Sequence, residues 1–122
     1  MTIHHVSLET RRGDLDAEVA FWALLGFAQV QPPGELGERS TWVQSGGTQI
    51  HLLHADEPVV APDGHVAVVC PAFEETTEAL REAGFAVEAR TPYWGAPRAF
   101  TRSPGGHKVE VMAAPPGELP RV

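Results

Sequence analysis

The chain has 122 residues, of which 16 are acidic and 9 are basic, so its formal net charge is −7. This length suits one domain and is too short for two independent cores. The negative charge disfavours nucleic acid or an anionic membrane surface as a partner. The sequence does not open with a basic stretch and an apolar run, and no segment is apolar enough to span a bilayer. We therefore expect a cytoplasmic protein.

The first half of the sequence predicts a strand, a helix and three more strands. Asp14 is the expected cap of the helix, and Gly26 is its expected end. The loops between the strands contain the Pro and Gly residues that turns require. In chain order, alternation and helical spacing predict a strand over 3–9, a helix over 15–25 and strands over 27–31, 39–44 and 48–53.

The second half repeats this order of elements. Gly84 is the expected end of its helix, and the single cysteine, Cys70, is expected to be a buried strand residue and not a reactive thiol. The predicted elements are a strand over 65–70, a helix over 73–83 and strands over 85–90, 97–102 and 107–112. The domain plan is thus a module at about 2–54, a linker at 55–63, a module at about 64–113 and a loose tail at 114–122.

The two halves are related as an internal repeat. GGTQIHLL at 46–53 and GGHKVEVM at 105–112 are offset by 59 residues, and we align 39–53 with 98–112 without a gap. Helices of about eleven residues cover only one face of a four-stranded sheet, so the other face must curl. The sequence therefore predicts an α+β fold in which two paired βαβββ modules form a half-open barrel around a cavity.

Four side chains that can bind a metal occupy matching places in this repeat. His5 and His65 lie on the first strand of each module, and His51 and Glu110 lie on the last. Imidazole and carboxylate together suit a divalent transition metal, which accepts either group at one position. The residues alone leave open the alternative that these are ordinary strand histidines. The histidines that we assign to that alternative are His4, His54 and His107, and strand parity places His4 and His107 on the opposite face.

The helix stretch DLDAEVAFWALLGF at 14–27, with HHV, IHL, GHV and VEV on the strands, resembles the vicinal oxygen chelate superfamily. This superfamily includes glyoxalase I, extradiol dioxygenases, methylmalonyl-CoA epimerase, fosfomycin-resistance thiol transferases and bleomycin-resistance proteins. The resemblance covers residues 2–113 and implies the glyoxalase/bleomycin resistance/dihydroxybiphenyl dioxygenase-like fold. It also implies a divalent metal ion (Ni, Zn, Co, Mn or Fe) with the ligands His5, His51, His65 and Glu110.

The resemblance implies lyase or isomerase chemistry on a small oxygen-bearing substrate that chelates the metal, with Glu110 moving a proton. His51 departs from the bacterial glyoxalase I pattern, which has a glutamate there, and the exchange removes one candidate base. The main alternative is a protein that sequesters an antibiotic, as the bleomycin-resistance proteins do.

Two further members of the superfamily rank lower. An extradiol dioxygenase needs open metal positions, and His51 would fill one of them. GGHKVEV and Ser7 resemble the fosfomycin thiol transferases, but Phe100 stands where those enzymes have a tyrosine. The tail also lacks their phosphonate-binding basic residue, for which Arg90 and Arg98 are the candidate replacements.

Strand parity and loop chemistry indicate which side chains contact a small-molecule ligand. Trp94 has a dimer contact as its alternative role. The resemblance implies a homodimer, and the sequence leaves open whether the site lies in one chain or between two. The ligand-contacting residues predicted in this way are Trp42, Gln49, Tyr93, Trp94, Phe100 and Lys108, and the resemblance to the fosfomycin enzymes adds Ser7 and Arg98.

Overall fold

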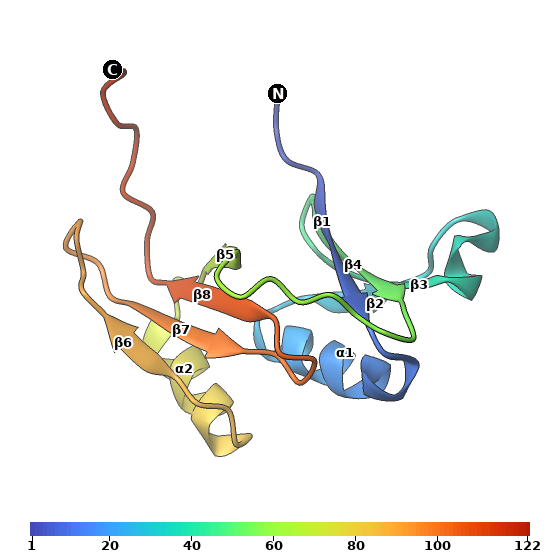
Figure 1. Cartoon of the computed structure of the whole chain (residues 1–122). Coiled ribbons are helices and arrows are strands. Elements are labelled where there is room, and N and C mark those ends of the chain that lie inside the picture. The colour runs from blue at the N-terminus through green and yellow to red at the C-terminus, as the bar shows by residue number, and fades with distance from the viewer.

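The computed structural model describes all 122 residues and contains two modules with the same order of strands and helices (Figure 1). The first comprises β1 (His5–Thr10), η1 (Arg12–Asp14), α1 (Leu15–Leu24), β2 (Ala28–Val30), η2 (Gly34–Glu38), β3 (Ser40–Ser45) and β4 (Thr48–His54). The second comprises β5 (Val66–Val69), α2 (Phe73–Glu82), β6 (Glu88–Arg90), β7 (Arg98–Arg102) and β8 (Lys108–Met112). Neither helix is long and apolar enough to cross a bilayer.

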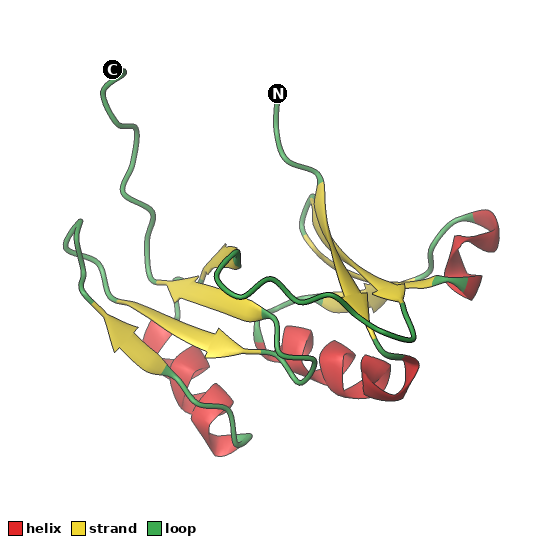
Figure 2. Ribbon diagram, viewed as in Figure 1, coloured by secondary structure: helices red, strands yellow, loops and turns green.

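Each module forms one four-stranded sheet, with strand orders β1-β4-β3-β2 and β5-β8-β7-β6. The first and last strands of each module pair in parallel, and the other neighbours are antiparallel. Both helices lie on one side of the sheets, and the opposite faces are open (Figure 2). The predicted α+β fold of two βαβββ modules is confirmed, and the sheets stay half-open without closing into a barrel.

The helices end where the sequence predicts and for the same reason in both modules. Gly26 and Gly84 have φ values of 88° and 94°, a region that glycine enters without strain. The residues after them, Phe27 and Phe85, donate backbone hydrogen bonds of 3.0 Å across the last helical turn. Asp14 is the N-cap residue of α1, as predicted, but its side chain makes no capping hydrogen bond, because η1 precedes the helix directly.

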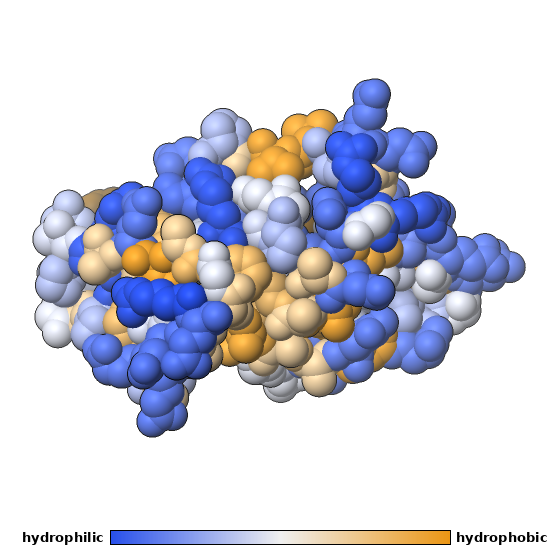
Figure 3. Space-filling model, turned by 90° about the horizontal axis from the view of Figure 1, so that it is seen from below, coloured by the Kyte–Doolittle hydropathy of each residue, from blue (hydrophilic) through white to orange (hydrophobic).

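A single apolar core joins the two modules. Phe21 and Trp22 of α1 are almost fully buried. The Phe21 ring packs edge-to-face against the Phe85 ring of the second module, with the ring centroids 5.1 Å apart. Seen from the helix side, apolar atoms gather across the middle of the molecule (Figure 3). Cys70 belongs to this core, and its burial raises the pKa of the thiol, which keeps it protonated.

The repeat contains one extra residue that the gap-free alignment conceals. Trp42 is opposite His51 across β3 and β4, and Phe100 is opposite Glu110 across β7 and β8. Trp42 and Phe100 are therefore equivalent at an offset of 58, whereas His51 and Glu110 are equivalent at 59. The insertion lies in the loop over 103–107, because five residues separate the paired Arg102 and Lys108, whereas four, 45–48, separate the equivalent pair Gln44 and Gln49. The alignment of 39–53 with 98–112 without a gap is thus wrong.

Residues of this longer loop donate hydrogen bonds to a buried carboxylate of the first module. Glu18 of α1 is fully buried, and its Oε1 accepts hydrogen bonds from Ser103 Oγ at 2.6 Å and from the Gly105 amide at 2.7 Å. Its Oε2 accepts one from Trp22 Nε1 at 3.0 Å. A buried carboxylate is tolerated when donors satisfy its oxygens in this way. Thr76 holds the matching place on α2, so only the first module makes this contact.

Replacing Glu18 with alanine is expected to lower the free energy of unfolding by about 3 kcal/mol, because three donors lose their acceptor in a buried place. Urea denaturation followed by circular dichroism measures the change. The matched control is Glu78→Ala on the exposed side of α2, which is expected to stay within about 0.5 kcal/mol. Equal effects of the two substitutions would show that the carboxylate does not join the modules.

Gly105→Ala is expected to cost about 1–3 kcal/mol, because the added Cβ would lie 2.8 Å from Glu18 Oε1. Gly47→Ala is the control, since Gly47 faces open space and its φ is not positive. In a Glu18→Ala background the cost of Gly105→Ala should largely disappear, and denaturation of the double variant measures this coupling. If Gly105→Ala lowered the free energy of unfolding equally in both backgrounds, its added Cβ would not be clashing with Glu18.

Candidate functional site

The first pair of predicted ligands meets on the open face of the first sheet. Val6 and Leu8 of β1 pack against the core, which turns His5 to the other face, and the register pairs Ser7 with His51 of β4. The rings of His5 and His51 stack with their centroids 4.0 Å apart and their planes at 17°. The fold therefore brings these two imidazoles together on one face of the first sheet.

His51 lies between two other rings and is nearly inaccessible. The Trp42 indole stacks on its second face at 3.8 Å and 4°, and only 6% of the residue is exposed. Burial, and then the neighbouring His5 and His4, hold the pKa of His51 below its ordinary value. His51 is therefore neutral near pH 7, which is the form that binds metals. Gln49 Oε1 lies 2.8 Å from its Nε2 and orients the ring.

The second pair meets at the matching place of the second sheet. His65 immediately precedes β5, and its Nε2 lies 3.2 Å from Glu110 Oε1 of β8. The register pairs Ala67 with Glu110, just as it pairs Ser7 with His51. His5 therefore lies two residues before Ser7, the partner of His51, and His65 lies two residues before Ala67, the partner of Glu110. The two pairs are equivalent in the fold as well as in the sequence.

Arg98 competes for the carboxylate of this second pair. Its Nη1 donates to Glu110 Oε2 at 3.2 Å, and the two side chains are only 13% and 8% exposed. Arg98 Nε also donates to the Thr91 carbonyl at 2.9 Å, which fixes the guanidinium in place. Both oxygens of Glu110 therefore already have partners within the chain.

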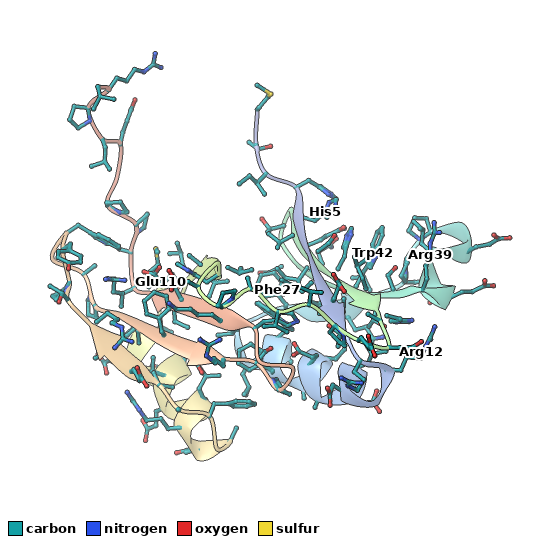
Figure 4. The ribbon with its side chains drawn as sticks, viewed as in Figure 1. His5, Arg12, Phe27, Arg39, Trp42 and Glu110 are labelled. Atoms are coloured by element: carbon teal, nitrogen blue, oxygen red, sulfur yellow. The ribbon has the colours of Figure 1, made fainter.

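The two pairs do not come together within one chain. His5 and Glu110 lie on different sheets and apart from one another (Figure 4), and no three His, Cys, Asp or Glu side chains form a group that could hold a metal ion. A single chain therefore supplies two halves of the predicted site and no complete one.

Ser7 and Lys108 lie near these pairs, whereas Trp94 and Tyr93 of the β6–β7 loop have partners within the chain. Ser7 lines a cavity of about 260 Å³ between β1 and the linker, which also includes His65. Lys108 lies next to Phe100, with its Nζ 4.3 Å from the ring centroid. The Trp94 indole donates to the Ala114 carbonyl at 2.8 Å. Tyr93 is exposed, and the Arg98 guanidinium lies 5.4 Å from its ring.

Sequence reasoning missed the neighbours that surround these residues. Gln44 accepts a hydrogen bond of 2.8 Å from Gln49, and strand parity on β3 could have placed it there. His4 was expected to face away, yet its Nδ1 lies 3.0 Å from that of His5, because the chain before β1 does not follow strand parity. Arg102 borders the cavity at Phe100, as alternation along β7 could have indicated, and it lies there with Arg90, which the sequence had already named as a candidate anion-binding residue.

Comparison with known proteins decides the family. The family model described as the Glyoxalase/Bleomycin resistance protein/Dioxygenase superfamily matches residues 2–111. The chain belongs to this superfamily. No curated protein matches the sequence.

Solved structures of the superfamily share the fold at low sequence identity. A glyoxalase family protein from Bacillus anthracis has a TM-score of 0.81 and 23% identity over 92% of this chain and 93% of that one. Lactoylglutathione lyase from Agrobacterium tumefaciens has a TM-score of 0.68 and 22% identity, over 91% and 92%. Oxidase ChaP-H1 has a TM-score of 0.74 and 23% identity, over 97% and 99%. Such identities establish the glyoxalase-superfamily fold and leave the reaction open.

His107 and His54, which the sequence assigns to structural roles, each make hydrogen-bonding contacts within the chain. His107 is 5% exposed, and its Nε2 lies 2.8 Å from the Glu9 carbonyl. His54 accepts a hydrogen bond from Arg12 at Nδ1 (3.1 Å), and its Nε2 lies 2.9 Å from Thr41 Oγ1. Burial and the Arg12 charge lower the pKa of His54, and its hydrogen bond to the Glu38 backbone opposes them only in part.

The lowered pKa predicts a stability that depends on pH. Unfolded His54 takes up a proton near its ordinary pKa, about 6.5, while the folded state resists it, so its contribution is present above that pH and is lost as the pH falls. His54→Gln should therefore lose less stability than the wild type between pH 7.5 and pH 5.5 in urea denaturation. The stability of His54→Gln should still fall somewhat with pH, because the pKa of His51 is also lowered in the folded state. Identical slopes would contradict the role of His54.

Proposed function

We propose that the protein is a metal-dependent lyase or isomerase of the glyoxalase type, acting on a small oxygen-bearing substrate. The observation that supports this most is the equivalence of the two pairs, His5 with His51 and His65 with Glu110, at the same register in both modules. Chance placement of strand histidines would give no reason for this repetition.

A second copy of the chain completes the metal site in this proposal. The donor types fit a divalent transition metal, since three imidazoles and one carboxylate match the preferences of Zn, Ni, Co, Mn or Fe. One chain forms no group of three such residues, so it does not fit a metal by itself. The open faces of both sheets lie on the side away from the helices, where a second copy can approach (Figure 2). The functional unit is then a homodimer.

Glu110 is the residue that moves a proton in this proposal. A bound divalent metal would polarise a substrate carbonyl. Glu110 then removes or returns a proton at the neighbouring carbon, a role that contributes about 10²–10⁴-fold in rate. Arg98 is its positioning residue, because the guanidinium holds Oε2 and leaves Oε1 toward His65. On the other sheet, Trp42 and Gln49 contact His51 and orient its ring, and in this proposal both also contact the substrate.

A ligand-sequestering protein of the bleomycin-resistance type is the second candidate. The observation that favours it is the flat stack of Trp42, His51 and His5, which offers aromatic faces to a planar ligand without a metal. Stoichiometric ligand binding that survives chelation would distinguish it from the enzyme. An extradiol dioxygenase and a fosfomycin-type thiol transferase rank below both.

The shared metal site is tested by mixing two variants, each damaged in one half. His51→Ala and Glu110→Gln dimers should each bind metal weakly. After subunit exchange, half of the dimers are mixed and each mixed dimer has one intact site, so metal content should recover to about one quarter of the wild-type value. Elemental analysis of desalted protein, with light scattering for the oligomeric state, measures this.

A site within one chain predicts no recovery on mixing, because every chain then carries one damaged ligand. A mixture of His51→Ala with His5→Ala serves as the matched control, since both lesions lie in the same half and neither arrangement restores a site. Wild-type protein that neither contains nor takes up a divalent metal would contradict the enzyme proposal and leave the sequestering protein.

A further inference from the structure

Basic side chains gather on the open face of the second sheet, in a chain that is acidic overall. This face carries four of the nine Lys and Arg residues, although the formal net charge is −7. The register explains the gathering, because Arg90 is opposite Arg98 and Arg102 is opposite Lys108, and residues opposite one another share a face. Like charges placed this way repel one another, and the carboxylates of Glu88, Glu110 and Asp63 offset this repulsion within the chain.

Three of these cations surround one aromatic ring beside a cavity. Lys108 Nζ lies 4.3 Å from the Phe100 centroid, and the guanidinium carbons of Arg90 and Arg98 lie at 5.5 and 5.7 Å. The cavity next to Phe100 has a volume of about 260 Å³, and its lining includes Ala86, Glu88 and Arg102. It is small, and its lining combines apolar side chains with three cations and one carboxylate.

Two of the cations have partners that a ligand can replace. Arg90 is paired with Glu88, whose side chain is 64% exposed, and Lys108 with Asp63, whose side chain is 91% exposed. Ion pairs this exposed contribute little stability, so exchanging the carboxylate for a ligand anion costs little. Arg98 differs, because its partner Glu110 is buried and belongs to the proposed catalytic pair.

We propose that this face binds a small organic anion, with a carboxylate or phosphonate held by Arg90 and Lys108 and an apolar body packed against Phe100. The inference rests on the proposed function in one respect: it names the substrate of that enzyme as an anion of this class. Phe100 is the equivalent of Trp42 in the first sheet, so both modules place an aromatic side chain beside their ligand pair.

The test compares benzoate and phenylphosphonate with benzamide, a neutral analogue of benzoate, by NMR titration of protein that has been stripped of metal with EDTA and then desalted. Benzoate and phenylphosphonate should bind about tenfold or more tightly than benzamide, with amide shifts centred on β6, β7 and β8. Their affinity should fall as salt rises from 20 to about 300 mM, because exposed charges are screened. Equal affinity for benzoate and benzamide, or no binding of either anion, would overturn the proposal.

Variants separate the charge from the apolar wall. Arg90→Gln and Lys108→Gln should each weaken anion binding by about tenfold and leave benzamide unchanged. Phe100→Leu should weaken all three probes. Arg39→Gln, which removes a charge from the first module, is the matched control and should change none of them. Shifts that centre on the first sheet, or an equal loss with Arg39→Gln, would overturn the assignment to this face.

This experiment and the test of the metal site fail independently. Binding is measured without metal, so a protein that takes up no metal can still bind the anions, and then only the enzyme proposal falls. A protein whose variants recover metal on mixing but which ignores benzoate and phenylphosphonate keeps its metal site and loses the anionic substrate.

Discussion

The buried carboxylate of Glu18 determines how the two modules meet. Each module has one helix for one four-stranded sheet, and neither could bury its apolar face alone in so short a chain. The carboxylate accepts hydrogen bonds from its own helix and from the β7–β8 loop, so it fixes α1 against the second sheet in one orientation. The contact between the Phe21 and Phe85 rings then forms beside it, and both open faces keep to the same side.

The duplication has been broken at the place where this contact is made. The one-residue insertion lengthens the loop that carries Ser103 and Gly105, and the first module keeps a tight turn instead. Gly105 must lack a side chain because Glu18 occupies the space where a Cβ would lie. The first strand pairs with the last strand in the same register in both modules, so the ligand pairs stay equivalent. The longer loop of the second module thus provides the packing contact with Glu18. The strand pairings that the two modules share place the two ligand pairs at equivalent positions.

Hydrophobic alternation and glycine positions were enough to predict every main strand and both helices. Local rules determine those features, and Gly26 and Gly84 end the helices as expected. The inserted residue escaped because a gap-free alignment of SGG with PGG looks equally good, and only the hydrogen-bonding register distinguishes them. Glu18 also escaped, because a glutamate within a helix is ordinarily exposed and its acceptor role depends on a loop 85 residues away. The two ligand pairs lie on different sheets of the chain. The spacing of residues in the sequence does not determine how far apart those two sheets lie.

Arg98 connects the proposed metal site with the proposed anion site. In the free chain its charge is neutralised by Glu110, and both side chains are largely buried. If Glu110 became a metal ligand, Arg98 would lose part of that neutralisation, and a buried cation without a partner is strongly unfavourable. An anionic substrate beside Phe100 would restore a negative charge next to the guanidinium. One side chain therefore borders both proposed sites.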